Sequence, residues 1–188
     1  MNLKQTNILL EYIFLIITIL GATGFIINYT PSNIFLLVVF ITYKIIKHYN
    51  HKKNIGLKEH HYTIILFSLY AALLGDNLLD LFYIYPFYDK ILHFILPFTF
   101  TYILLDINIL KKYKFLAILI ILGSACILEF IEFFVDQVLN GLMQGVFVKN
   151  QQGYLQSPHF DTMYDLLTGF FASILSYVIY ILTKKDQA

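Results

Sequence analysis

The chain has no arginine and only one cysteine among its 188 residues. Its basic residues are all lysines, which disfavours a mechanism that needs the bidentate guanidinium clamp of arginine on phosphate. Cys126 lies within an apolar run, and a single cysteine excludes an intrachain disulfide. The net charge of +1 gives the chain no overall basic character, so we expect no nucleic-acid partner.

Three familiar catalytic motifs are also absent. The sequence contains no His-Glu-x-x-His helix, no Gly-x-Ser-x-Gly nucleophile elbow and no Walker loop. Ser124 and Cys126 have no nearby base on the same helix face, which makes both poor candidates for a nucleophile. The sequence therefore offers no conventional nucleophile or nucleotide-binding loop.

Long apolar stretches dominate the sequence instead. It is 59% hydrophobic and 13% charged, with a mean hydropathy of +0.70, more than a soluble domain can hide from water. A transmembrane helix needs about 20 mostly apolar residues. We therefore predict an all-α polytopic membrane protein, a six-transmembrane-helix bundle that forms one integral membrane domain over residues 1–188. The predicted spans are residues 8–28, 33–49, 62–85, 89–110, 115–139 and 160–183.

The lysines indicate the orientation of this bundle. Eleven of them precede the first span, surround the loop between spans two and three, lie between spans four and five, or follow the sixth span. Only Lys90 and Lys149 lie on the other side. The positive-inside rule places the lysine-rich side in the cytoplasm. We expect both termini inside the cell and the protein in the inner (cytoplasmic) membrane, surrounded by membrane lipid.

Acidic residues gather at the opposite, outward-facing ends of spans three to six. Eight of the twelve acids lie there, with only two lysines as basic neighbours. Two lysines cannot neutralise eight carboxylates, so the acids must share protons, hold a metal ion or line a cation path. The eight are Asp76, Asp80, Asp89, Glu129, Glu132, Asp136, Asp161 and Asp165.

The spacing of these acids places them on one face of each helix, since residues three or four apart are neighbours on a helix surface. Charged groups are costly in lipid, so these faces should line the bundle interior or a wet cavity. Carboxylate oxygens suit magnesium, manganese or calcium, while a histidine leaves zinc or iron as alternatives. The expected metal ligands are Asp89, His93, Glu129, Asp161 and Asp165. The expected catalytic residues, as general base or as supports of the ligands, are Glu132 and Asp136.

Three motifs in the second half of the chain resemble the signature of the YjdF-like inner-membrane proteins. The pattern Tyr-Asp-Arg/Lys-x-x-His-Phe, Glu-x-x-Glu and Asp-Thr-x-x-Asp occurs in that order at residues 88–94, 129–132 and 161–165. A looser likeness extends to VanZ-like proteins, although this chain lacks the arginine often found before their last Asp. The YjdF-like resemblance supplies no reaction, and it implies a site at Asp89, His93, Glu129, Glu132, Asp161 and Asp165.

We expect divalent-metal-dependent hydrolysis or phosphoryl transfer on a lipid-linked or envelope substrate. One alternative is a small cation or proton-coupled transporter, which needs a polar path to the cytoplasmic side. The inner halves of spans three to six are mainly Ile, Leu, Phe and Tyr with Asp106 as the inner acid, which favours a dead-end funnel. Two further alternatives are a non-catalytic membrane partner subunit and carboxylates that are partly protonated and merely hydrogen-bonded.

Overall fold

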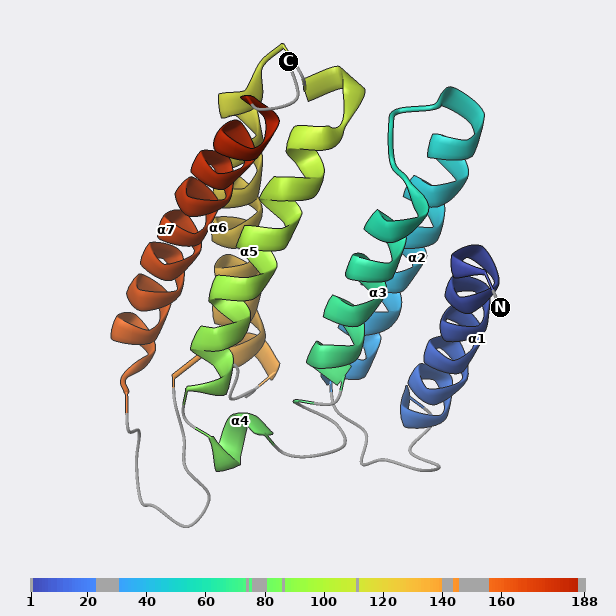
Figure 1. Ribbon diagram of the computed structural model, residues 1–188. Coiled ribbons are helices and arrows are strands. Elements are labelled where there is room, and N and C mark those ends of the chain that lie inside the picture. Colours follow the sequence, from blue (N-terminus) through green and yellow to red (C-terminus); the bar gives the residue numbers. More distant parts are fainter. Residues whose placement is uncertain are drawn as a thin grey trace. The chain divides into compact units, whose positions relative to one another are not determined.

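The computed structural model is built from α-helices (Figure 1), which confirms the all-α prediction. The chain divides into two compact units, Met1–Leu81 and Phe82–Ala188, and each is described by itself. The prediction of one integral membrane domain stays a prediction. The structure describes residues 2–22, 31–73, 75, 81–85, 87–110, 112–139, 144–145 and 156–185.

The first unit contains the helices α1 (Leu3–Ala22), α2 (Pro31–Lys53) and α3 (Glu59–Leu73). Aromatic side chains form its core. The fully buried Phe14 of α1 stacks on Phe40 of α2 with 5.1 Å between ring centroids, and it meets the edge of Tyr70 of α3 at 5.3 Å. These offset and edge-to-face contacts are the favoured geometries for aromatic pairs. One ring of α1 therefore contacts both other helices.

The second unit follows in chain order. Its elements are α4 (Leu81–Ile84, whose first residue closes the first unit), α5 (Tyr88–Asp106), the 3-10 helix η2 (Asn108–Leu110), α6 (Lys114–Leu139) and α7 (Pro158–Lys185). Figure 1 shows α5 and α7 running in the same direction and α6 running antiparallel to both. The beginnings of α5 and α7 and the end of α6 therefore lie at one end of this unit. A buried cluster of Leu105, Leu110, Ala117 and Tyr180 closes the other end.

A glycine opposite a proline allows α5 and α7 to approach closely. A Cβ atom at Gly169 would lie 3.3 Å from Cγ of Pro97 and 3.6 Å from the carbonyl oxygen of His93. Pro97 lies inside α5 and lacks an N–H, so the carbonyl four residues earlier, that of His93, loses its helical donor. The absence of a side chain at Gly169 lets α7 lie directly against this point.

Among the described residues, three helices are long and apolar enough to cross a membrane. Large side chains such as Phe130, Phe134 and Phe171 are 68%, 55% and 62% exposed. An apolar surface of this kind suits lipid and not water. The three helical segments are Leu3–Leu20, Lys114–Val138 and Pro158–Thr183. Within the described residues, the predicted spans 33–49, 62–85 and 89–110 overlap α2, α3 and α5, which do not meet this criterion. The six-span topology and its orientation stay predictions.

Candidate functional site

The candidate site lies where α5 and α7 begin. Pro158 is the first residue of α7, a position that suits its fixed φ and missing N–H. Asp89 and Asp161 lie in the first turns of α5 and α7, respectively. Carboxylates are stabilised there because the free backbone N–H groups carry a partial positive charge. The spacing of four residues then places His93 and Asp165 on the same faces, one turn further along.

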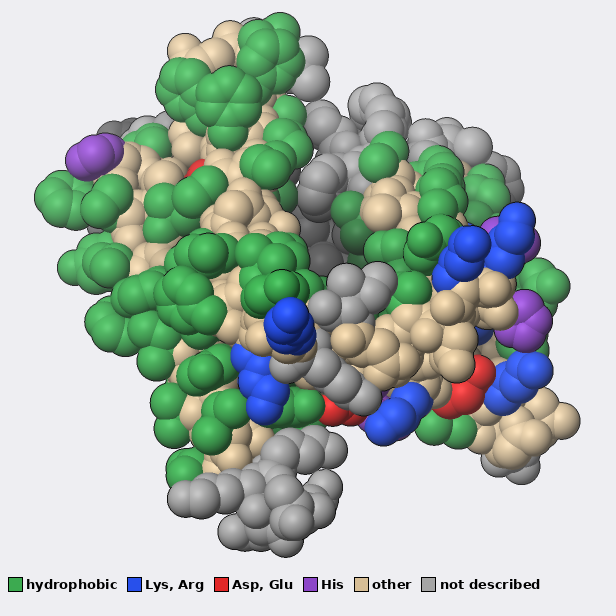
Figure 2. Space-filling view, turned by 90° about the horizontal axis from the view of Figure 1, so that it is seen from above, with side chains coloured by type: hydrophobic (Ala, Val, Ile, Leu, Met, Phe, Trp, Pro, Cys, Tyr) green, Lys and Arg blue, Asp and Glu red, His purple; other side chains and the backbone are tan. Residues whose placement is uncertain are grey.

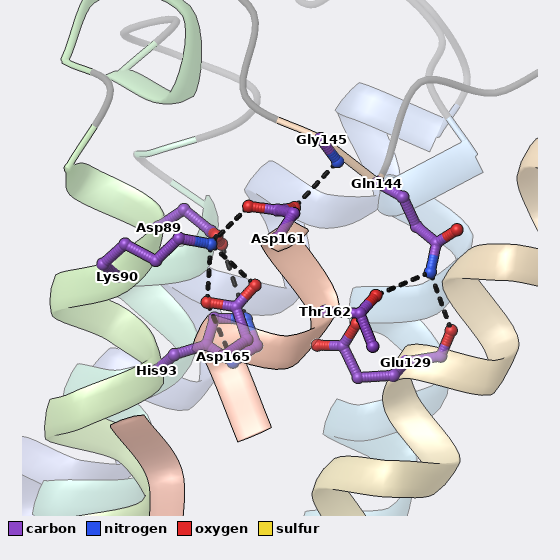
Figure 3. Close-up of polar contacts among 9 residues, drawn as sticks. All are labelled: Asp89, Lys90, His93, Glu129, Gln144, Gly145, Asp161, Thr162 and Asp165. Carbon is purple, nitrogen blue, oxygen red and sulfur yellow. Dashed lines mark hydrogen bonds and ion pairs between the residues drawn. The ribbon is translucent and has the colours of Figure 1, made fainter. Parts of the chain in front are cut away.

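The ammonium group of Lys90 lies among three carboxylates (Figure 3). Its Nζ lies 2.7 Å from each carboxylate oxygen of Asp165 and 3.0 Å from Oδ2 of Asp89, and it also forms an ion pair with Asp161. Asp161 and Asp165 are only 4% and 3% exposed, and charges so deeply buried need a partner. When ionised, the three carboxylates exceed this ammonium by two negative charges. The cluster can therefore accept a divalent cation as well.

His93 extends the cluster on the α5 side. Its Nε2 lies 3.4 Å from Oδ1 of Asp89, and its Nδ1 lies 3.9 Å from Oδ1 of Asp165. One ligand atom from each of these three residues lies within 4.8 Å of the others. Two ligands on opposite sides of an ion bound at about 2.0–2.6 Å are roughly 4–5 Å apart. The spacing fits one ion held by two carboxylates and an imidazole.

Glu129 of α6 has one carboxylate oxygen engaged and one free. Its Oε2 accepts a hydrogen bond from Oγ1 of Thr162 at 2.8 Å. Its Oε1 has no hydrogen-bond partner among the described residues, although the side chain is only 6% exposed. Figure 3 shows the side-chain amide of Gln144 linked both to the Thr162 hydroxyl and to the backbone carbonyl of Glu129. A buried polar atom without a partner is uncommon, so Oε1 is a second point at which a ligand can bind.

Gln144 and Gly145 join the end of α6 to the beginning of α7. The backbone N–H of Gln144 donates to Oδ2 of Asp136 at 2.8 Å, and its side-chain Nε2 donates to Oγ1 of Thr162 at 3.0 Å. The N–H of Gly145 donates to Oδ2 of Asp161 at 2.7 Å, with a φ of 90° that favours glycine. Because Gln144 donates to the Thr162 hydroxyl, that hydroxyl is left to donate toward α6.

Replacing Thr162 by valine should destabilise the protein by about 1–3 kcal/mol, because it removes the donor to a buried carboxylate and the acceptor for Gln144. Thermal unfolding in detergent measures this change. Thr183→Val is the matched control on the same helix, since Thr183 is exposed and bonds only to carbonyls of its own helix. Equal, small effects in both variants would show that the hydrogen bonds of Thr162 to Glu129 and Gln144 do not stabilise the protein.

All five predicted metal ligands lie at this end of the second unit. Asp89, His93 and Asp165 are the closest group, Asp161 is joined to them through the lysine, and Glu129 lies beside them on α6. The structure thus brings together residues from three helices. Their role as ligands stays a prediction.

The two predicted catalytic residues have different surroundings. Asp136 accepts the hydrogen bond from Gln144, so it holds the segment after α6. Glu132 is half-buried and lies near enough to Glu129 and Asp165 to interact with their charges. Neither catalytic role is tested by these positions. The acids at residues 76 and 80 lie outside the described residues.

Two residues of the site are hard to find from sequence. A count of charges treats Lys90 only as one of two lysines near the acids. Its position in the Asp-Lys-x-x-His motif could have indicated that it belongs to the site. Gln144 carries no signal, because it lies in the connection between α6 and α7, where no helical period constrains its position.

A line of small polar residues continues from the site along α7. Ser173 and Ser176 are fully buried, as is Thr101 of α5, and the hydroxyls of Ser176 and Thr101 have no hydrogen-bond partner among the described residues. The line ends where the Tyr180 hydroxyl donates to Oδ1 of Asp106 at 3.1 Å. This face of the second unit therefore carries buried polar groups in the half that lies away from the carboxylate cluster.

The fold and the site together define an α-helical membrane protein with a buried cluster of carboxylates around one lysine. The chain matches the family described as "Predicted membrane protein (DUF2238)" over residues 8–186, and it belongs to this family. That description confirms the membrane prediction and names no activity. No curated protein and no solved structure matches the chain.

Proposed function

We propose that the protein holds a divalent metal ion between α5 and α7 and uses it for hydrolysis or phosphoryl transfer on a lipid-linked or envelope substrate. The observation that carries this proposal is the convergence of Asp89, His93 and Asp165 in a cluster whose three carboxylates, when ionised, exceed the Lys90 ammonium by two negative charges. Carboxylate oxygens favour magnesium, manganese or calcium, and the imidazole admits zinc or iron.

Each neighbouring residue has a place in this chemistry. A bound divalent ion makes a coordinated water more acidic and polarises a phosphoryl oxygen. The free Oε1 of Glu129 can accept a proton, with Glu132 as the second candidate for that role. The Lys90 ammonium can attract the negative charge of a phosphoryl group, while Asp136 supports the site through Gln144.

We further propose that the chain crosses the inner membrane six times with both termini inside, so that the site faces outward. Within the second unit, Lys112 and Lys114 lie near the beginning of α6, at the opposite end from the acids, which supports this orientation. The family match supports the YjdF-like resemblance. The likeness to VanZ-like proteins stays a prediction based on the Asp-Lys-x-x-His element.

Metal content tests the proposal. Protein purified in detergent and supplemented with magnesium, manganese, calcium or zinc should retain close to one ion per chain, measured by inductively coupled plasma mass spectrometry. The retained ion would narrow the chemistry. Absence of metal after all four supplements would overturn the proposal and favour carboxylates that share protons.

A cation or proton-coupled carrier is the second candidate, and the buried hydroxyls along α7 favour it. Thr101, Ser173 and Ser176 lie between the acidic site and the Asp106–Tyr180 pair. Buried polar groups inside a membrane helix bundle often mark ion or proton paths. Flux measurements in proteoliposomes with a panel of cations and an internal pH dye would separate this candidate from a closed metal site.

A further inference from the structure

A second charged cluster lies in the first unit, around a buried acid of α1. Glu11 is only 5% exposed, and its carboxylate binds three side chains of α2. The Tyr43 hydroxyl donates to Oε1 at 2.6 Å, the Lys44 ammonium donates to Oε2 at 2.5 Å, and the Lys47 ammonium donates to Oε1 at 2.5 Å. One carboxylate thus holds two ammonium groups in fixed positions.

The ammonium groups of Lys44 and Lys47 exceed the carboxylate of Glu11 by one positive charge. Each ammonium has three N–H donors, so Lys44 and Lys47 keep donors beyond their bonds to Glu11. The Lys44 side chain is 50% exposed, whereas Lys47 is 23% exposed and lies 5.0 Å from the centroid of the Tyr62 ring. The excess charge is therefore held at a surface, with Glu11 acting as a positioning residue.

The surface beside Lys44 is apolar. Ile41, Ile45 and Tyr49 are 50%, 62% and 50% exposed, and their spacing of four places them on one face of α2 next to Lys44. A group that binds here meets cationic donors at one point and a strip of exposed hydrocarbon beside them. A phospholipid has this combination of chemistry, and a soluble anion lacks it.

The end of the unit where α2 leads into α3 adds further positive charge. Lys and His side chains gather over this end in the view of Figure 2. The sequence there provides exposed basic residues that continue from the cluster toward α3, and acidic charge is limited to Glu59. The exposed basic residues from the last turn of α2 to the first turn of α3 are His51, Lys52, Lys53, Lys58 and His60. Basic residues at a helix end attract anionic lipids.

We propose that Lys44 and Lys47 bind the phosphate of an anionic phospholipid whose acyl chain lies along the Ile41–Ile45–Tyr49 face of α2. Glu11 and Tyr43 hold the two ammonium groups so that both reach one headgroup. All of these residues belong to the first unit, and lipid binding by them does not depend on the proposed metal site.

The absence of tryptophan allows a direct test at this position. Ile45→Trp places a single tryptophan, which can be excited separately from the tyrosines, beside Lys44. Val178→Trp on the exposed face of α7 reports on bulk lipid. Each full-length variant is reconstituted with brominated phosphatidylglycerol or brominated phosphatidylcholine. At Ile45→Trp the quenching should show about fivefold tighter binding of phosphatidylglycerol, and at Val178→Trp the two lipids should bind about equally.

Charge-matched variants separate a site from general surface attraction. Both double variants are made in the Ile45→Trp background, and each removes two positive charges. K44Q/K47Q should reduce the preference for phosphatidylglycerol to about onefold, because it removes the proposed site. K52Q/K53Q should leave most of the preference, because it removes only nearby surface charge. A preference that is absent at the start, or lost equally in both pairs, would overturn the proposal. So would displacement of the lipid by soluble inorganic phosphate, which would identify a site for a free anion.

Loss of both lysines leaves the buried carboxylate of Glu11 without a cation, which can impair folding. The triple variant E11Q/K44Q/K47Q avoids this, and circular dichroism checks its helix content. It should show no lipid preference. The single variant E11Q keeps both ammonium groups but loses the carboxylate that positions them, so its lipid preference should fall between that of the unaltered protein and that of K44Q/K47Q. A preference in E11Q equal to that of the unaltered protein would contradict positioning by Glu11.

Discussion

Replacing Asp165 by asparagine is expected to remove metal binding from the protein. Asp165 is 3% exposed, provides one of the three converging ligand atoms, and bonds to Lys90 through both oxygens. Asparagine keeps the shape and loses the charge. The affinity for the metal ion should fall by more than about 100-fold. Changing a residue that only hydrogen-bonds to a metal ligand lowers metal affinity by about 10–100-fold, and the loss of a ligand itself should lower it more. Metal content after purification and a metal titration both measure this.

Asp106→Asn is the matched control for this experiment. It makes the same chemical change on α5, at an acid that bonds to Tyr180 at the other end of the second unit. We expect the control to keep the metal content of the unaltered protein. Equal retention in both variants would show that the ion is not held by Asp165, and equal loss in both would show that the loss is not specific to this carboxylate.

Replacing Lys90 by glutamine is expected to destabilise the metal-free protein by about 3–5 kcal/mol, because two buried carboxylates then lack a cation. The same change should strengthen metal binding, since a divalent ion no longer shares Asp165 with an ammonium group. Thermal unfolding in the presence of a chelator and of added metal measures both effects. The stabilisation by metal should be larger in Lys90→Gln than in the unaltered protein.

The control for this prediction is Lys112→Gln, which removes the same charge from an exposed side chain between η2 and α6. A surface change of this type should alter the free energy of unfolding by less than about 0.5 kcal/mol. If metal stabilises both variants and the unaltered protein by the same amount, the ion does not bind among the carboxylates around Lys90.

The helices and their polar faces were predictable because both follow from local spacing. Asp89 and His93, like Asp161 and Asp165, are four residues apart, and that spacing fixes them on one face whatever the rest of the chain does. The meeting of these faces followed from the cost of exposing charge to lipid. The sequence could therefore predict which acids share a site.

Other contacts depend on details that spacing does not contain. Lys90 follows Asp89 directly, so helical geometry alone places the two side chains on different faces of α5. The long, flexible side chain of Lys90 nevertheless reaches Asp161 and Asp165. Gln144 reaches Thr162 only because of the path of the α6–α7 connection. Such contacts are set by rotamers and loop conformation, and hydrophobic periodicity is silent about both.

Glu11 shows a different limit. It is a single acid in an otherwise apolar segment, and counting acids at one end of the bundle passes over it. The structure places it against Tyr43, Lys44 and Lys47 of the next helix. An isolated acid in a predicted span itself predicts a partner on a neighbouring helix, because a partner must offset the cost of removing the carboxylate from water.

The close approach of α5 and α7 at Gly169 and Pro97 has a consequence for the proposed metal site. Gly169 lies one turn beyond Asp165, and its missing side chain sets how near α7 comes to α5. The distance between the carboxylates of α5 and those of α7 thus depends on Gly169, a residue that has no side chain. A bulkier residue there would press on Pro97 and on the backbone carbonyl of His93 and so move the two helices apart. In the proposed metal site, the approach of the two backbones at this crossing would then limit the radius of the ion that fits.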